Sequence, residues 1–445
     1  MRKFRSQRLE KLLGTQITAD SLTWKHLLTL KDSKIREAAD LDYKLMYGTQ
    51  PSDRHKPGGD VAAMANTQGG LILIGADEDD DAQLTDLPGV LLSDREHTRL
   101  LSLIGDHVHP YAEFEVIPVP DPDREGMGCY VIAVHRSSRA PHGVLINEGY
   151  RWPRRLGHKT VNISEPELAT RYRARFALAR DQLSRSGEIE EITRNRCAVH
   201  PGSWVMVSLV PDLPGDMVVN WDTFTAFKRG FGSEDPVLLT NGWNSWERIA
   251  PGPRCLILDT GARLEYDERV EGQTAQLYAD GAGVFAMHQP DLNARARLDG
   301  RGDDLPCRLG ELSLMVAVLS GVRFLARYAR DYAYAGGDAL IRVKVGDPDP
   351  LRMELGTMGS GATVRLGQFV RHGASAERAA PLEELADDTP QLVATAAYLV
   401  GDIMRAFGHP DVLHITTDGR VAPGRWGEYA GSIRAWAERA GIETV

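Results

Sequence analysis

The sequence predicts a mixed α/β domain followed by an α+β domain that contains an antiparallel sheet. Three observations lead to this fold class. Hydrophobic residues make up 42% and charged residues 26% of the chain, which are globular averages and exclude a disordered, collagen-like or disulfide-stapled protein. The length of 445 residues corresponds to two or three domains of ~150 residues each. Helical and extended patterns are mixed up to about residue 180, and short extended patterns recur beyond it.

The first part of the chain shows helix and strand signals in close succession. Residues 5–31 are typical of one or two short amphipathic helices, and the alternation over 41–47 predicts a strand. The segment 48–59 is rich in Gly, Pro, Ser and Asp and predicts a loop. A helix is expected over 60–70. The continuous apolar run at 71–75 then predicts a strand that is buried on both faces.

A second group of elements completes this domain. A serine N-cap favours a helix over 93–107. Two strands are expected at 113–119 and 129–135, and a capping box favours a helix over 164–180. The composition changes at 181–192, where we expect a break between domains.

The sequence beyond this break predicts a separate α+β domain, so that the two expected domains are residues 1–180 and 193–445. A long helix is expected near 309–333, and two further helices near 389–407 and 425–440. Short strands of an antiparallel sheet are expected at 204–210, 236–240, 254–259, 263–266, 275–278, 283–288, 341–346 and 362–370.

The cysteines and the apolar runs indicate a soluble, cytoplasmic protein with no membrane partner. The four cysteines are more than 50 residues apart, so that neither a CxxC zinc site nor a disulfide framework is expected. The longest apolar stretch, 312–325, is interrupted by Arg323 and is too short to span a bilayer. No apolar run of signal-peptide length follows the basic N-terminus.

The net charge of −10 is distributed unevenly. Residues 1–36 carry a net charge of +6 and residues 136–180 a net charge of +7, and residues 1–180 together are neutral. The whole negative surplus therefore lies in residues 181–445. The basic blocks are either solvated helix faces or a surface for phosphate groups.

The segment 37–44, EAADLDYK, is the most informative for chemistry. On a strand, Asp42 and Lys44 point the same way because they are two residues apart. Many metal nucleases use such a pair: the carboxylate holds Mg²⁺ or Mn²⁺ and the lysine offsets the phosphate charge. Glu37 would join them only if the chain bends before the strand. The alternative is a plain exposed strand pair, because this triplet alone is common.

Two further carboxylates follow the buried strand at 71–75. Asp77 and Glu78 come directly after this strand, and ligands in α/β sheets gather at the carboxyl ends of strands. If the strand that carries Asp42 is its neighbour, Asp77 or Glu78 would complete a site of three carboxylates. The alternative is a solvated acidic turn, which is the interpretation we prefer for residues 79–81.

These motifs in this order resemble the Schlafen AlbA-like domain over about residues 5–180. The first family motif is Glu, four residues, Glu, an aromatic residue and Lys, and here Asp42 replaces the second Glu. The central motif A-N-T-x-G-G, an apolar strand and G-V-D-D is followed with Ala76 in place of Val, and Glu78 in place of the second Asp. The matching positions are Glu37, Tyr43, Lys44, Ala65, Asn66, Thr67, Gly69, Gly70, Gly75, Asp77, Pro141, His142, Arg155 and Gly157.

The resemblance implies a metal-dependent endoribonuclease that cleaves structured RNA such as tRNA, with a role in anti-phage defence. The implied catalytic residues are Glu37, Asp42, Lys44, Asp77 and Glu78, of which the four carboxylates would hold Mg or Mn. Asn66, Thr67, Gly69, Gly70 and Gly75 would form the structural motif. Bacterial relatives labelled as DNA- or ATP-binding regulators imply two alternatives: a non-catalytic nucleic-acid-binding regulator and, less favoured, an ATP-binding switch.

The basic stretch at 150–160 interleaves aromatic and cationic residues, which suits unpaired bases and their phosphates. The candidate nucleic-acid-binding residues are Arg151, Trp152, Arg154, Arg155 and Lys159. The alternative is a structural hairpin with surface charge. Because relatives with two such lobes form a clamp, we expect this single lobe to form a homodimer. The acidic C-terminal domain would sense a phage-derived or protein trigger, or dimerise.

Other motifs predict no second site. The sequence contains no P-loop string G-x4-G-K-[ST], and the Gly-rich segment 356–361 is expected to be a plain loop. His107 and His109 lack a third ligand nearby in sequence, and the tryptophans 221, 243 and 246 are expected to be core residues more than a binding surface.

Overall fold

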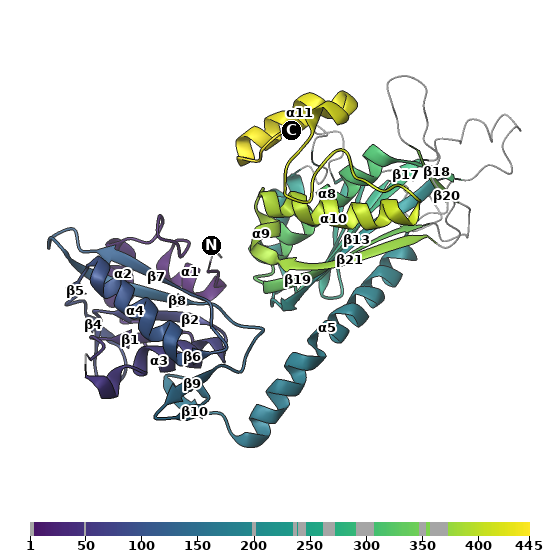
Figure 1. Cartoon of the computed structure of the whole chain (residues 1–445). Helices are drawn as coiled ribbons and strands as arrows, with labels where there is room; N and C mark the ends of the chain where they lie inside the picture. The colour runs from purple at the N-terminus through teal and green to yellow at the C-terminus, as the bar shows by residue number, and fades with distance from the viewer. Residues whose placement is uncertain are drawn as a thin grey trace, which may run out of the picture. The chain divides into compact units, whose positions relative to one another are not determined.

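The computed structural model describes residues 4–48, 50–197, 202–234, 238, 246–260, 272–290, 307–346, 353–356 and 373–445. The chain divides into two compact units, Met1–Leu178 and Ala179–Val445, which we call unit 1 and unit 2. Figure 1 labels their elements. The fold is a mixture of helices and mostly antiparallel sheets, as the sequence predicts.

Unit 1 is built from short helices and short strands. In chain order its elements are α1 (Gln7–Leu13), α2 (Trp24–Asp32), β1 (Leu41–Lys44), η1 (Pro51–Asp53), α3 (Lys56–Ala65), β2 (Gly70–Ile74), β3 (Asp77–Glu78), β4 (Leu84–Asp86), β5 (Val90–Leu91), α4 (Asp94–His107), β6 (Val108–His109), β7 (Phe114–Pro120), β8 (Met127–Val134), β9 (Gly143–Ile146), β10 (Gly149–Arg151), β11 (Pro153–Leu156) and β12 (Lys159–Asn162), followed by α5 (Glu165–Arg194).

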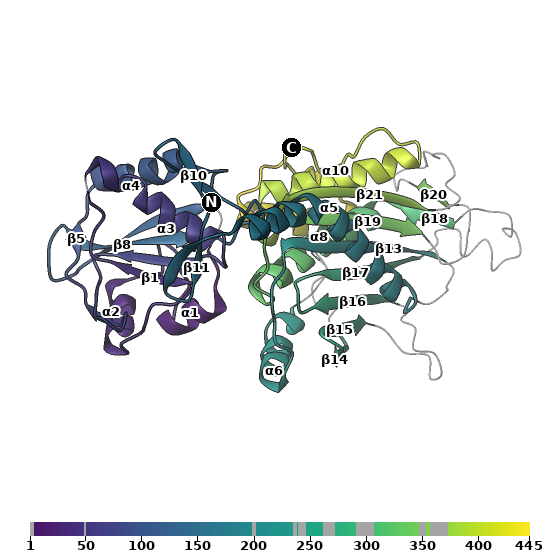
Figure 2. The ribbon, with the colours of Figure 1, turned by 90° about the horizontal axis from the view of Figure 1, so that it is seen from below.

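The central sheet of unit 1 runs in the order β1-β2-β8-β5, with β7 also paired to β8. Strand β1 lies beside β2 in parallel, with Asp42 opposite Ile72, and so the two strands are the neighbours that the three-carboxylate site requires. One face of the sheet packs against α1 and α2, and the other against α3 and α4 (Figure 2). Strand β2 contributes Leu71 and Leu73 to the first face, and Ile72 and Ile74 to the second, so it is buried on both faces as predicted.

Two boundaries in unit 1 differ from the sequence prediction. Helix α3 starts at Lys56, inside the predicted loop, because Pro57 suits the first turn of a helix. The predicted break at 181–192 is part of the continuous helix α5, although Gly and Ser weaken helical propensity there. Ser186 is held in the helix because its hydroxyl donates to Glu190, one turn later.

Unit 2 contains a seven-stranded antiparallel sheet in the order β14-β15-β16-β17-β13-β19-β21. Its elements beyond α5 are β13 (Gly202–Leu213), α6 (Trp221–Arg229), η2 (Phe231–Ser233), β14 (Arg248–Gly252), β15 (Cys255–Thr260), β16 (Gln273–Tyr278), β17 (Gly283–Pro290), β18 (Cys307–Gly310), α8 (Glu311–Asp331), β19 (Gly336–Gly346), β20 (Met353–Gly356), β21 (Ala374–Pro381), α9 (Leu382–Ala386), α10 (Pro390–Ala406), η3 (Pro423–Arg425), η4 (Gly427–Tyr429) and α11 (Ala430–Ala440).

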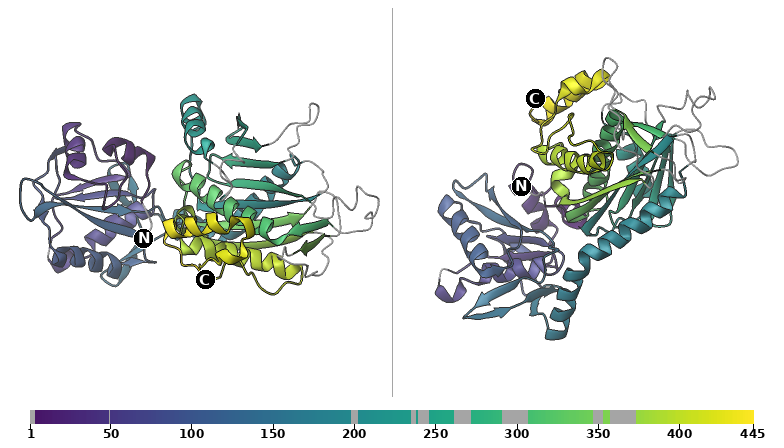
Figure 3. Two further views of the ribbon diagram at one scale, coloured as in Figure 1. Left: turned by 90° about the horizontal axis from the view of Figure 1, so that it is seen from above. Right: turned by 45° about the vertical axis from the view of Figure 1, so that its right-hand side comes forward.

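The two faces of this sheet have different partners. Val205, Val207 and Leu209 of β13 point into the large hydrophobic core that α8 and α10 form on one face. The alternating residue Val210 packs with Ile189 of α5 on the opposite face. Figure 3 shows α5 and α10 on opposite sides of the sheet.

Helix α8 is long and apolar enough to cross a membrane by length and composition alone. Within the described part of the chain it is the one helix of this kind, and 78% of its most apolar window is buried inside the protein. A core helix of a globular protein meets the same criteria, so this is weak evidence for a membrane span.

The predicted elements of unit 2 match the sheet and helices where the structure describes them. The predictions at 204–210, 254–259, 275–278, 283–288 and 341–346 fall on strands of the sheet. The predicted strands at 263–266 and 362–370 lie outside the described residues, as does the prediction at 236–240 apart from Leu238.

Candidate functional site

The chain bends just before β1, and this bend brings Glu37 beside the strand. Ala38 and Leu41 pair with each other across a tight turn, and the backbone N–H of Glu37 donates to the carbonyl of Ala82. The Glu37 carboxylate then accepts a hydrogen bond of 2.7 Å from the backbone N–H of Tyr43. The odd spacing of Glu37 from Asp42 is therefore compensated by the bend that the sequence hypothesis required.

Asp42 lies at the centre of a charged cluster and is only 1% exposed. Its Oδ1 accepts a hydrogen bond of 2.7 Å from Nη1 of Arg155, and its Oδ2 forms an ion pair with Lys44. The guanidinium of Arg155 also donates to the carbonyl of Ala38 and lies 3.8 Å from Oε2 of Glu37. Asp42 and Lys44 thus form the predicted pair, and an arginine from a distant hairpin completes it.

The structure distinguishes the two carboxylates that follow β2. Glu78 belongs to the cluster: burial raises its pKa, the charge of Asp42 adds to this effect, and Lys44 and a hydrogen bond with Glu37 oppose it. Both residues are exposed, but the carboxylate of Asp77 accepts a hydrogen bond from the backbone N–H of Glu78. Of the two predicted ligands, Glu78 is the one placed with Glu37 and Asp42.

Asp60 is a cluster member that the sequence did not identify. It lies on α3 and accepts a hydrogen bond of 2.9 Å from the hydroxyl of Tyr47. Burial, and next the charge of Asp42, raise the pKa of Asp60 to about 6. In the sequence this residue has no motif of its own, and an aspartate near a helix start is usually a partner of the helix dipole.

Crowding of carboxylates is the main electrostatic property of the site. Burial, and next the negative charge of Asp42, raise the pKa of Glu37 to about 8, although the N–H of Tyr43 and Lys44 oppose this shift. The Glu37 carboxyl group also shares a hydrogen bond with Asp42. At neutral pH Glu37 therefore holds a proton. This proton neutralises one of the negative charges that a bound cation would otherwise balance.

The charge count of the cluster depends on the proton of Glu37. With Glu37, Asp42, Asp60 and Glu78 all ionised, the two cations Lys44 and Arg155 leave a formal surplus of two negative charges, and with Glu37 protonated the surplus is one. The surplus therefore matches one divalent cation only once Glu37 has lost its proton. Among the residues that the structure describes, no three His, Cys, Asp or Glu side chains are grouped as a complete metal-binding set. Mg²⁺ does not need such a set, because it commonly uses one or two carboxylates, waters and substrate phosphates.

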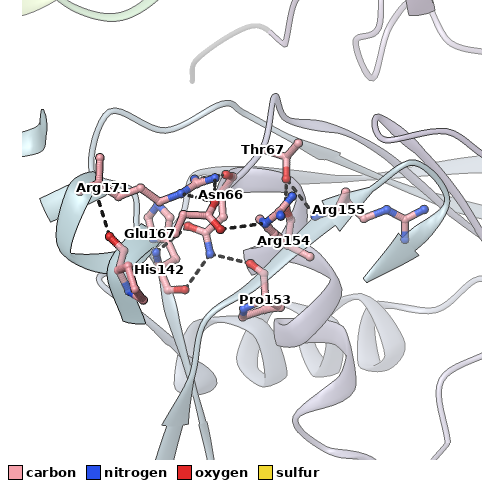
Figure 4. A network of polar contacts seen from close by, with 11 residues as sticks. Asn66, Thr67, His142, Pro153, Arg154, Arg155, Glu167 and Arg171 are labelled. Carbon is pink, nitrogen blue, oxygen red and sulfur yellow. Dashed lines mark hydrogen bonds and ion pairs between the residues drawn. The ribbon is translucent and has the colours of Figure 1, made fainter. Parts of the chain in front are cut away.

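The motif around Asn66 holds the backbone at His142 and at Pro153 in place. The side-chain amide of Asn66 donates to the carbonyls of His142 and Pro153, at 2.9 and 2.8 Å, and its oxygen accepts from the N–H of His142. The hydroxyl of Thr67 accepts a hydrogen bond of 2.9 Å from the backbone N–H of Arg155 (Figure 4). The motif therefore fixes the backbone from which Arg155 reaches Asp42.

The glycines of the same motif are required by close backbone packing. Gly69 has φ +75°, and a Cβ there would lie 2.6 Å from the carbonyl oxygen of Val134. Gly75 has φ +94°, and a Cβ would lie 2.9 Å from Cα of Gly89. These residues, together with Gly70, where a Cβ would meet the backbone of Asp40, allow β2 to pack tightly within its sheet.

Arg155 and Arg154 are less accessible than the sequence prediction of nucleic-acid-binding residues requires. Arg155 is 4% exposed and donates a hydrogen bond to Asp42, so its predicted role as a surface contact to nucleic acid is wrong. In the alternation of β11 it points inward, whereas Arg154 is half-buried and pairs with Glu167 at 3.3 Å. Glu167 also binds Arg171, which donates to the carbonyl of Asn66 (Figure 4).

The remaining candidates of the basic stretch are more accessible. Arg151 on β10 and Lys159 on β12 are exposed. Trp152 is half-buried, and its ring centroid lies 6.1 Å from that of Tyr150, which is 42% exposed. These hairpins present cations next to aromatic rings.

The other sequence candidates form no second site in unit 1. His107 hydrogen-bonds the carbonyl of Leu103, while His109 contacts the ring of Tyr150. In unit 2 Trp246 is a core residue and Trp221 is exposed. Trp243 and most of the segment 356–361 lie outside the described residues.

Of the comparisons with known proteins, the family match agrees with the motif analysis. Residues 37–164 match the family described as Schlafen, AlbA_2, a narrower range than the 5–180 expected from the motifs. The curated proteins contain no match to the chain. Among solved structures, the crystal structure of the DIP2311 protein from Corynebacterium diphtheriae is 18% identical, with a TM-score of 0.23. The match covers 38% of this chain and 32% of that one, about a third of its length.

Proposed function

Because residues 37–164 carry a Schlafen AlbA_2 domain, which indicates a nucleic-acid-related function in a family with nuclease-like members, we propose that unit 1 is a metal-dependent endoribonuclease. Its substrate would be structured RNA such as tRNA, and its role anti-phage defence. The observation that supports this proposal best is the cluster of four carboxylates around two cations, which leaves a surplus of negative charge.

The chain's own residues have distinct tasks in this proposal. Glu37 and Asp42 would hold Mg²⁺ or Mn²⁺, with Glu78 at the edge of the cluster. When bound, such an ion activates water and neutralises charge that develops on the phosphate. Arg155 holds the carboxylate of Asp42 in position. Lys44, whose side chain is 30% exposed, can pair with a substrate phosphate as well as with Asp42.

RNA binding would use the exposed parts of the hairpins β9–β10 and β11–β12. Arg151 and Lys159 would contact phosphates, and the rings of Tyr150 and Trp152 would stack on unpaired bases. Arg154, which pairs with Glu167, would act at the margin of this surface. A second copy of the chain would complete the groove, and we propose that the homodimer works in the cytoplasm.

The test is incubation of the full chain with total tRNA, with Mn²⁺, with Mg²⁺ and with a chelator. Wild-type protein is expected to cleave tRNA in the presence of Mn²⁺, and the chelator is expected to abolish this cleavage. The Asp42→Asn and Glu37→Gln variants are expected to lose at least ~1,000-fold in cleavage rate and to retain tRNA binding in a gel-shift assay. Asp81→Asn, in the exposed acidic turn, is the matched control and should cleave normally.

A second candidate function is a non-catalytic nucleic-acid-binding regulator. It is favoured by the ion pairs of Asp42, whose two carboxylate oxygens each face a cation. If wild-type protein binds tRNA or DNA but cleaves neither in Mn²⁺, the endoribonuclease proposal fails and this alternative stands.

A further inference from the structure

The face of the unit 2 sheet that α5 covers is unusually polar. Ser208 of β13 and Thr274 and Gln276 of β16 are each at most 3% exposed, and they alternate with the apolar residues of the opposite face. Arg342 and Lys344 of β19 lie on the same face as Ser208, because they approach Glu190 of α5. This face therefore combines buried polar contacts with two small apolar clusters, one around Ile189 and Val210 and one around Trp204 and Met206.

Glu190 is the central charge of this face and is 3% exposed. Its Oε1 accepts hydrogen bonds of 2.7 Å from the hydroxyls of Ser186 and Ser208. Its Oε2 pairs with Lys344 and lies 3.6 Å from Nη1 of Arg342. One buried carboxylate therefore has two cations, and it keeps a partner in Arg342 when Lys344 binds another anion.

A cavity of about 260 Å³ opens beside this pair, within unit 2. The last turns of α5 form one wall, with Glu190, Glu191 and Arg194, and Lys344 forms another. Glu191 is paired with Arg194 at 3.2 Å. Trp204 and Met206 of β13 supply an apolar surface. The volume is slightly below the ~300–1,000 Å³ of drug-sized ligand sites, so it suits a molecule of one or two rings.

We propose that this cavity binds a small organic anion with a flat apolar part. The anionic group would pair with the ammonium of Lys344, whose side chain is 39% exposed. The flat part would pack against the accessible parts of Trp204 and Met206, which are 1% and 7% exposed and favour aromatic contacts. Glu377 faces Arg342 across the strand pair, but it is exposed, where water and salt screen its charge.

The test is calorimetric titration of the full chain with two probes of equal shape, indole-3-acetate and the neutral indole-3-acetamide. Wild-type protein is expected to bind the acetate with a Kd of about 1 mM or tighter and the acetamide at least tenfold more weakly. Lys344→Met should remove this preference for the charged probe. Lys228→Met, an exposed lysine of α6, is the matched control and should leave both affinities unchanged.

A second variant blocks the cavity without removing a charge. A Cβ at Gly346, which lines the cavity, would meet only Cα of Gly373, at 3.7 Å, so Gly346→Leu has room to fold. Gly346→Leu should weaken the binding of indole-3-acetate at least tenfold, while its circular dichroism spectrum remains that of the wild-type protein. The proposal is overturned by a flat wild-type titration with the acetate, by equal affinity for both probes, or by unchanged binding in Gly346→Leu.

Discussion

Unit 1 and unit 2 each bury one carboxylate between a lysine and an arginine. Asp42 of β1 pairs with Lys44 and Arg155, and Glu190 of α5 pairs with Lys344 and lies near Arg342. Each of the two carboxylates is at most 3% exposed. Their nearest partners are thus almost the same, although one contributes to a crowded acidic cluster and the other does not.

The difference lies in the groups that surround the pair. Asp42 has Glu37 and Asp60 as further acidic neighbours, and the pKa values of both are raised. Glu190 instead receives hydrogen bonds from two serine hydroxyls. A buried carboxylate with a lysine and an arginine therefore does not identify a metal site by itself. The net charge of all the groups around the pair decides whether the site attracts a cation or an anion.

The largest expected effect comes from removing the arginine of unit 1. Arg155→Met leaves Asp42 without its fully buried partner, which costs about 3–5 kcal/mol in the free energy of unfolding. Lys344→Met in unit 2 should cost less than ~1 kcal/mol, because Arg342 remains and Lys344 is partly exposed. Calorimetric unfolding of the full chain measures both, and equal losses would contradict the comparison.

Asn66→Ala is expected to have the next largest effect. It removes three buried hydrogen bonds and leaves the backbone groups of His142 and Pro153 without this partner, at a cost of about 3 kcal/mol. Ser208→Ala in unit 2 removes one hydroxyl donor to Glu190, which costs about 1 kcal/mol. Denaturant unfolding measures the loss of stability in both variants. A larger loss in Ser208→Ala than in Asn66→Ala would show that Asn66 does not anchor the segments of His142 and Pro153.

The pH dependence of stability separates the two carboxylate environments further. Folded unit 1 keeps the Glu37 proton up to a pKa of about 8, whereas the ordinary value is 4.5. The folded state therefore binds more protons between these pH values, and its stability falls as the pH rises from about 4.5 to about 8.

Glu37→Gln should remove this loss of stability. It should raise the stability of unit 1 at pH 8 by about 1–2 kcal/mol, because the amide keeps the neutral form that the site prefers. Thermal melting at pH 5.5 and pH 8 measures the effect. Glu190→Gln is the counterpart in unit 2, where the loss of charge leaves Lys344 and Arg342 unpaired and should destabilise. A stabilising Glu190→Gln would contradict the distinction between the two sites.

The smallest expected effect distinguishes the two carboxylates that follow β2. Glu78→Gln should lower the rate of Mn²⁺-dependent cleavage about tenfold, since Glu78 shares the cluster with Glu37 and Asp42. Asp77→Asn should change it less than about twofold, because the contact of the Asp77 carboxylate is with the backbone N–H of Glu78 and not with the cluster. Initial rates at subsaturating Mn²⁺ provide the measurement. A larger loss in Asp77→Asn would exchange the roles of the two residues.

Local spacing predicted the parts of the site that are close in sequence. The D-x-K alternation placed Asp42 and Lys44 together, and the apolar run predicted that β2 is buried on both faces. That β1 is the parallel neighbour of β2 was an assumption, which the structure bears out. The bend before β1 had to be assumed, and the pairing of Ala38 with Leu41 supplies it. Motif order also predicted the family of this unit, and the match over residues 37–164 confirms it.

The rest of the cluster depends on contacts that local patterns do not encode. Arg155 is 113 residues from Asp42 and lies in a run of basic residues, so it looked like a surface cation. Asp60 enters through the packing of α3, which sequence periodicity places but does not orient toward Asp42. The composition change at 181–192 falls within the continuous helix α5, because the packing of α5 on the unit 2 sheet overrides the weak helical propensity there. The two units nevertheless divide close by, between Leu178 and Ala179.

The separation of Asp42 and Arg155 in sequence has a consequence during synthesis. Ribosomes add about 5–20 residues per second, so roughly 6–23 s pass between the translation of Asp42 and that of Arg155. During this interval the nascent chain carries the crowded carboxylates without the guanidinium that stabilises their arrangement. The cluster can therefore be completed only after β11 has been synthesised, and a chain truncated before β11 would carry the four carboxylates without Arg155.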